Sequence, residues 1–387
     1  MSDQQEKKPN IFLRLLAFLV TLALVLGALA VVVYRDRLNL DALKRWLSFR
    51  KVETGDTGEA APFTHAGGDK LSVEYLEDGV VMTSASGIHY YSFSGEPYAE
   101  EVLTMENPVL CAGSRAAVAY DVGGRSLFVL RGKSKTADLS LDSGELLSAR
   151  INDSGYLAVT AQQSGYKGSV TVYNVNSTSR KEIIQLNFSS VFVADAAVSP
   201  DSKTVAVITI GQENGSFFSQ LLLYPVDSIE PSATLSLGNL AVLDLDYEAE
   251  QLWVLGEDRL LSVAADGSDY ETYSFGRSYL KGCHLGGDGF AVLLLGRYQA
   301  GGAEQVLTID PQCQLIAQAP LRGQVLSFSA AGRYLSLLTG SGLEIYTRDM
   351  SLYRALEDTQ DARFTALSPN VSALLADSQQ AWLYIPS

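Results

Sequence analysis

The chain shows two hydrophobic patterns, one long apolar run near its start and many short apolar runs after it. The long run extends from Leu15 to Val33 and holds nineteen residues without a charge. A helix of this length spans the ~30 Å hydrocarbon core of a bilayer. A buried core helix would carry a polar stripe. A cleaved signal peptide has a shorter apolar run and a small-residue cleavage site, whereas Tyr34-Arg35-Asp36-Arg37 follows here.

The sequence therefore predicts an uncleaved transmembrane helix over residues 11–34, preceded by a short tail over residues 1–10. The residues expected to contact the lipid bilayer are Leu15, Leu19, Leu24, Leu29 and Val33. Two orientations stay open. More Lys and Arg follow the helix than precede it, which favours a cytoplasmic body. The short N-terminal arm with Lys7 and Lys8 is instead typical of an anchor with a cytoplasmic N-terminus, and long domains translocate largely regardless of charge. We expect an exported body.

A basic juxtamembrane segment occupies residues 35–51. Its part from Leu38 to Phe49 places apolar residues among basic ones, the composition of an amphipathic stretch that lies on a membrane surface, with Trp46 at headgroup level. Residues 52–61 (VETGDTGEAA) are small or polar and are expected to form a linker.

From residue 62 to residue 387 the chain is a repeat of short strands. Each unit has a turn signal followed by a second strand, and most units then show a third strand. The second strands read VVMTSA, AAVAYD, YLAVTAQ, TVAVITI, QLWVLG, FAVLLLG, YLSLLTG and VSALLAD. A period near 40 residues with four strands per unit is typical of an all-β β-propeller, because one blade cannot bury its apolar faces alone. We expect eight blades, or seven if one unit is poorly formed.

The last unit shows only three strands before Ser387. The strand that completes it is expected to come from Pro62-Phe63-Thr64-His65, which would leave no open edge in the ring.

Charge excludes one class of partner. The first 51 residues carry a net charge of +5, whereas the remaining residues carry 20 basic and 40 acidic side chains. Such an acidic body repels phosphate backbones, so nucleic acid is not expected as a partner.

Local catalytic motifs are missing from the sequence. Gly132-Lys133-Ser134 lacks the first glycine of a P-loop, and Ser341 lies in no G-x-S-x-G turn. The three histidines are scattered, and three Trp are too few for the repeated docking motif of quinone-dependent propeller enzymes. We expect no cofactor, no resident metal and no catalytic residues from motifs. An enzyme whose site is assembled from the loops of several blades remains an alternative.

Three aspartates are the candidate binding residues. Asp244 and Asp246 alternate on the first strand of one blade (VLDLD), and Asp195 has a comparable place in VFVADAAV. Alternate residues of a strand point to one face, and first strands line the channel of a propeller. These carboxylates are therefore weak candidates for a cation-binding ring; they could equally cap strand ends or face channel water.

Two motifs carry a family resemblance. Ser199-Pro200-Asp201-Ser202-Lys203 is similar to the turn of WD40-like and TolB-like propellers. Together with the anchor, the amphipathic segment and Tyr120-Asp121-Val122-Gly123-Gly124, it makes the chain resemble the DUF5711 family of Firmicutes proteins. The resemblance implies a bacterial, membrane-anchored propeller and supplies no catalytic residues.

The function expected from these features is a non-catalytic binding or scaffolding module at the bacterial cell envelope. Its partner would be another envelope protein or a wall polymer. A propeller that faces the cytoplasm is the further alternative.

Overall fold

The structure is a computed structural model that describes residues 16, 18–22, 25, 40–50, 52–68, 70–176, 181–248 and 251–386. The chain divides into two compact units, residues 1–48 and residues 49–387.

Helix α2 (Leu40–Phe49) forms within the predicted amphipathic segment, and Asp41 in its first turn is placed favourably for the helix dipole. The predicted membrane helix over residues 11–34 lies mostly outside the described residues, as do Leu15, Leu24, Leu29, Val33 and the side chain of Trp46. Leu19 is described and is 52% exposed. In the described part of the chain, no helix is both long enough and apolar enough to cross a bilayer.

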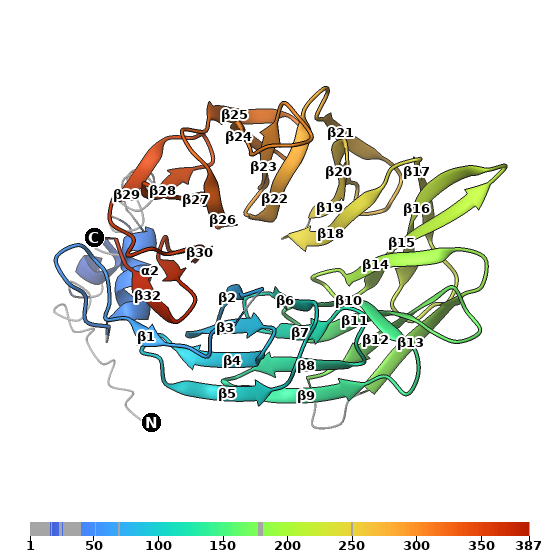
Figure 1. Ribbon diagram of the computed structural model, residues 1–387, viewed down its shortest axis with the longest axis horizontal. Coiled ribbons are helices and arrows are strands. Elements are labelled where there is room, and N and C mark those ends of the chain that lie inside the picture. Colours follow the sequence, from blue (N-terminus) through green and yellow to red (C-terminus); the bar gives the residue numbers. More distant parts are fainter. Residues whose placement is uncertain are drawn as a thin grey trace, which may run out of the picture. The chain divides into compact units, whose positions relative to one another are not determined.

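The second unit is an eight-bladed β-propeller, which confirms the predicted fold and blade number (Figure 1). Each blade is a four-stranded antiparallel sheet whose strands follow one another in the chain, except in blade 8.

Blades 1 to 4 have these strands: β2 (Ser72–Leu76), β3 (Gly79–Ser84), β4 (Gly87–Ser92) and β5 (Pro97–Val102); β6 (Pro108–Ala112), β7 (Ala117–Asp121), β8 (Ser126–Arg131) and β9 (Ser134–Ser140); β10 (Glu145–Ile151), β11 (Tyr156–Gln162), β12 (Gly168–Asn174) and β13 (Lys181–Phe188); β14 (Phe192–Val198), β15 (Thr204–Glu213), β16 (Ser216–Pro225) and β17 (Ala233–Gly238).

Blades 5 to 8 have these strands: β18 (Val242–Glu248), β19 (Gln251–Gly256), β20 (Arg259–Val263) and β21 (Tyr270–Ser274); β22 (Tyr279–Gly287), β23 (Phe290–Gly296), β24 (Gln305–Ile309) and β25 (Leu315–Pro320); β26 (Val325–Ala331), β27 (Tyr334–Thr339), β28 (Gly342–Thr347) and β29 (Leu352–Leu356); β30 (Phe364–Leu367), β31 (Ala373–Ala376), β32 (Gln380–Tyr384) and β1 (Phe63–Thr64).

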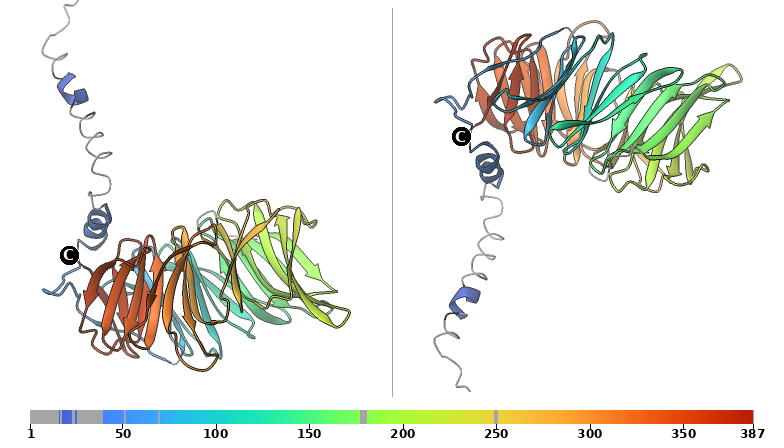
Figure 2. Two further views of the ribbon diagram at one scale, coloured as in Figure 1. Left: turned by 90° about the horizontal axis from the view of Figure 1, so that it is seen from above. Right: turned by 90° about the horizontal axis from the view of Figure 1, so that it is seen from below.

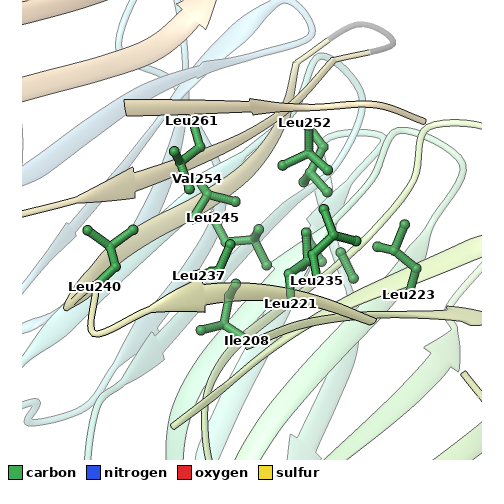
Figure 3. Close-up of a cluster of buried hydrophobic side chains, with 13 residues drawn as sticks. Ile208, Leu221, Leu223, Leu235, Leu237, Leu240, Leu245, Leu252, Val254 and Leu261 are labelled. Atoms are coloured by element: carbon green, nitrogen blue, oxygen red, sulfur yellow. The ribbon is translucent and has the colours of Figure 1, made fainter. Parts of the chain in front are cut away.

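Second strands are apolar on both faces because a neighbouring blade covers each face. Every residue of β23, for example, is buried, whereas the outermost strand β17 alternates between exposed and buried residues. Eight hydrophobic clusters fill the spaces between successive blades. Figure 3 shows the cluster between blades 4 and 5, where Ile208 and Leu221 of blade 4 pack against the blade 5 core that includes Val254. Burial of each such side chain contributes about 1.5–3 kcal/mol.

Strand β1 closes the ring by pairing with β32, with Phe63 opposite Ala381 and Thr64 opposite Gln380. This confirms the predicted exchange between the two ends of the repeat. The predicted linker over residues 52–61 is not a free spacer, because it extends this closure. Ala60 N donates to Leu383 O over 2.8 Å, and Trp382 Nε1 donates to Glu59 Oε1 over 3.2 Å.

The antiparallel order of each blade gives the propeller two distinct faces. Figure 2 shows the blades edge-on, with their strands running from one face to the other. We call one of them the mouth face. At this face each first strand begins, each second strand turns into the third strand, and each fourth strand ends. First strands end at the opposite face, which we call the linker face. Phe49 packs there against Phe93, which follows the end of β4, with 4.8 Å between ring centroids.

Candidate functional site

The first strand of every blade lies at the centre of the ring and lines the channel (Figure 1). The three predicted aspartates are on two of these strands, Asp195 on β14 and Asp244 and Asp246 on β18. The structure brings all three together, and it does so around one residue that the sequence analysis did not single out, Arg150 on β10.

Arg150 connects three consecutive blades. Its Nε donates to Asp195 Oδ2 over 2.9 Å, and its Nη2 donates to Asp244 Oδ1. Its Nη1 lies 3.9 Å from Asp246 Oδ1. Ser148, two residues earlier on β10, donates to the other oxygen of Asp195 over 2.6 Å. We call these five residues the channel cluster.

The electrostatics of the channel cluster follow from its enclosure. Burial alone would lower the pKa of Arg150, but its three aspartate neighbours outweigh burial and hold the pKa well above its usual value. Burial raises the pKa of Asp246 to about 6, and the charge of Arg150 opposes this rise only in part. Two glutamates elsewhere on the first strands behave similarly. Burial raises the pKa of Glu74 to about 7 and that of Glu248 to about 8.

The guanidinium takes the place that a bound cation would have among the three carboxylates. Among the residues that the structure describes, no group of three or more His, Cys, Asp or Glu side chains is placed to hold a metal ion. Arg150 and the three aspartates thus form a network of ion pairs that links blades 3, 4 and 5. The sequence held one indication of the role of Arg150. This residue alternates with Ser148 on a first strand, which places a basic side chain at a channel position of an acidic domain.

The histidines and cysteines do not join this cluster as ligands. His284 on β22 is enclosed, burial lowers its pKa to about 4, and its Nδ1 accepts from Gly286 N over 3.1 Å. His89 lies 3.7 Å from Glu100 on the outer side of blade 1. The three cysteines are free thiols. Burial raises the pKa of Cys111, beside the channel cluster, to about 11, so its thiol is protonated at neutral pH.

A second feature lies at the mouth of the channel. Four exposed hydrophobic side chains occur at the starts of four consecutive first strands: Phe192 (53% exposed), Leu243 (58%), Tyr279 (45%) and Leu326 (38%). We call them the mouth arc. Lys167 from the preceding blade lies over the ring of Phe192, with its Nζ 5.1 Å from the ring centroid.

Exposed hydrophobic residues are concentrated on this face. Of the eleven large exposed ones in the described propeller, eight belong to the mouth face by their position in the blades, namely the mouth arc with Val102, Tyr166, Phe217 and Tyr298. The other three, Ile229, Leu315 and Leu352, follow third strands or begin fourth strands and so belong to the linker face. Exposed hydrophobic residues that gather on one face of a protein can form an interaction surface.

Two loops of the mouth face have different structures. Residues 211–219 form the tip of the long β15–β16 hairpin, in which Phe217 is 71% exposed, whereas residues 296–302 form a loop between β23 and β24 that carries Tyr298. Both are on the mouth face.

Comparisons with solved structures support the fold. The chain is similar to Sqt1 from Saccharomyces cerevisiae, with 10% identity, a TM-score of 0.60, and coverage of 86% of this chain and 100% of that one. It is also similar to BamB from Moraxella catarrhalis, with 11% identity, a TM-score of 0.50, and coverage of 84% and 98%. At such identities the likeness concerns the fold alone. No curated protein matches the chain.

One family model matches the chain, and it covers residues 57–237, from the closing segment to the last strand of blade 4. Its description is a family of unknown function. This match confirms the resemblance drawn from the sequence: residues 57–237 match the model of the DUF5711 family.

Proposed function

We propose that this chain is a membrane-anchored, non-catalytic binding module of the bacterial cell envelope, and that its propeller docks another envelope protein on the mouth face. The observation that carries the proposal is the mouth arc.

The chemistry of the mouth arc suits protein docking. Protein interfaces are enriched in aromatic residues, and a few such side chains at the centre of a contact supply most of the binding energy. Phe192 and Tyr279 are rigid aromatic anchors with large exposed surfaces, and Leu243 is the second residue of the first strand between them. The carboxylates of the channel cluster, in contrast, are used to hold Arg150 between three blades, which supports a structural role for the cluster.

The place where the chain joins the propeller supports the same function. Phe49 and the closing segment pack on the linker face, so a tether that precedes them attaches opposite the mouth face.

Docking is tested by site-specific photocrosslinking in intact cells. Phe217 on the mouth face and Ile229 on the linker face are a matched pair, since both are 71% exposed and both belong to blade 4. A photoreactive residue at position 217 or 279 is expected to give discrete protein adducts that Leu243→Asp removes, whereas position 229 gives none. Equal adducts at 217 and 229, or none at 217 and 279, would overturn the docking proposal.

Anchoring and orientation are tested by thiol labelling. In a variant without the three native cysteines, single cysteines are placed at Ser2 and at Asn214, in the tip of the β15–β16 hairpin. A membrane-impermeant reagent is expected to label only Asn214→Cys in intact cells, with the protein in the membrane fraction after alkaline extraction. Labelling of only Ser2→Cys would contradict export, and release by alkali would contradict the anchor.

A further inference from the structure

The space between blades 2 and 3 has polar residues on a third strand where several other blades have apolar ones. Elsewhere the third strand of a blade usually places buried apolar residues against the preceding blade, as Phe128 and Leu130 do in blade 2 and Leu261 and Val263 do in blade 5. In blade 3 the corresponding face of β12 carries Ser169, Thr171 and Tyr173.

The register shows the replacement directly. Thr171 lies opposite Val159 on β11, as Leu261 lies opposite Val254 in blade 5. The other face of the same strand is ordinary, because Val170 and Val172 are fully buried against blade 4. Thr171 therefore replaces an apolar side chain on this face, where Tyr173 still packs on the hydrophobic cluster between blades 2 and 3. Departures of this kind from the packing pattern occur where function requires them.

The polar face lines a groove of about 430 Å³ between the two blades. Its walls include Asp142 from the loop after β9 and Glu182 and Gln185 from β13. Ser169 is 97% buried, and its hydroxyl donates a long hydrogen bond of 3.3 Å to Ala161 O.

A second hollow adjoins this groove and shares Gln163 with it. It ends at the mouth face with Tyr166, which is 43% exposed. The surface thus offers hydroxyls, amides and carboxylates along its length, with the guanidinium of Arg125 and the aromatic ring of Tyr166 in the second hollow.

We infer that this groove binds a neutral oligosaccharide. Sugar hydroxyls both donate and accept hydrogen bonds, which suits carboxylates, amides and hydroxyls placed side by side. Among the described residues lining the deeper groove there is no Lys or Arg, and two carboxylates are present, so an anionic polymer is disfavoured. A hydrophobic peptide finds few apolar contacts there. Tyr166 offers a flat ring on which the apolar face of a sugar can stack.

The site goes beyond the proposed docking function and uses none of the mouth arc. It is tested by titration calorimetry on the full chain in lipid nanodiscs, since a glycoside detergent would itself present a sugar. The probes are cellotetraose, chitotetraose and maltotetraose, with tetragalacturonate as the anionic comparison. At least one neutral tetrasaccharide is expected to bind, and tetragalacturonate is expected to bind at least tenfold more weakly.

Two variants locate the site. Tyr166→Ala is expected to weaken binding about tenfold, whereas the matched control Tyr298→Ala, at an exposed tyrosine of blade 6, leaves binding unchanged. Thr171→Leu introduces the residue type that blade 5 uses, so it is expected to abolish binding while the melting temperature stays the same or rises.

Three results would overturn the inference: no binding of any neutral tetrasaccharide at millimolar concentration, equal binding of tetragalacturonate, or binding that survives both Tyr166→Ala and Thr171→Leu. The retained or raised melting temperature of Thr171→Leu separates loss of the site from loss of the fold. Photocrosslinking at the mouth arc tests a different surface, so either proposal can fail alone.

Discussion

At the scale of single residues, the channel cluster shows how one cation organises several carboxylates. Asp195 is only 13% exposed and Arg150 21%, so both are largely removed from bulk water. Each is stabilised by its partners, and removal of one partner leaves the others enclosed without compensation. The side chains of Asp244 and Asp246 are more exposed, at 39% and 37%, but the surrounding first strands enclose Asp246 within the channel.

Removal of the guanidinium is therefore expected to destabilise the propeller. Arg150→Met keeps much of the side-chain volume and should lower the free energy of unfolding by about 2–4 kcal/mol, because partly solvated carboxylates lose less than fully buried ones. Urea unfolding measures this change. Adding Asp195→Asn to Arg150→Met should recover part of the loss. If Arg150→Met lowers the free energy of unfolding by less than about 0.5 kcal/mol, the inference that Arg150 stabilises the contact between blades is wrong.

A second prediction at this scale concerns pH. Burial raises the pKa of Glu74 to about 7 and that of Glu248 to about 8, above their values in an unfolded chain. The folded state then binds more protons than the unfolded state, so stability falls as pH rises through this range. His284, whose pKa burial lowers, opposes this trend only below about pH 6.5.

The melting temperature should therefore fall between pH 6.5 and pH 8.5, as differential scanning calorimetry would show. Glu248→Gln should flatten this dependence and raise the melting temperature at pH 8.5. The exposed Glu230→Gln serves as the control and should leave the slope unchanged. A melting temperature that rises from pH 6.5 to pH 8.5 would contradict the assignment.

At the scale of elements, much of the fold could be predicted because turn signals and strand patterns repeat. The second strands β11, β19 and β23 have the predicted bounds, since each is a dense apolar run directly after a turn. The closing strand could be predicted because a blade lacked its fourth strand. The packing of residues 52–61 could not, because their small and polar composition is that of a spacer and their partners lie more than 300 residues away.

The sites were harder to predict than the strands. Strand alternation placed Asp195, Asp244 and Asp246 in the channel, but no local pattern indicates that Arg150 from another blade lies between them. The groove depends on which face of β12 meets blade 2. The polar residues Ser169 and Thr171 resemble the exposed positions of any half-buried strand until the blades are assembled.

The closing strand β1 yields a prediction at the element scale. Phe63 is 9% exposed, and its ring centroid lies 5.6 Å from that of Tyr91 in blade 1. Phe63→Ala should destabilise the propeller by about 3–5 kcal/mol, because it leaves a cavity at the junction of the first and last blades. The exposed Phe217→Ala is the control and should change stability by less than about 0.5 kcal/mol. Equal urea midpoints for the two variants would show that closure contributes little.

At the scale of the whole molecule, the excess of acidic residues is the dominant property. The full chain carries a formal net charge of −15, and the residues after position 51 carry 20 basic and 40 acidic side chains. Because like charges on a compact body repel one another, the folded state is destabilised by its own charge, and salt relieves this repulsion.

Raising NaCl from about 10 mM to about 150 mM shortens the screening length from about 30 Å to about 8 Å and should raise the melting temperature. A melting temperature that falls with salt would show that attractive ion pairs, such as those of Arg150, outweigh the general repulsion.

The pairing of β1 with β32 has a consequence for biosynthesis. Thr64 and its partner Gln380 are 316 residues apart, so at 5–20 residues per second the ribosome needs about 15–60 s to make the second after the first. During this interval β1 has no partner strand, and blade 8 cannot assemble. Chains released early from the ribosome therefore never form a complete ring and expose an unpaired strand edge, which gives proteases and chaperones a structural criterion for a full-length product.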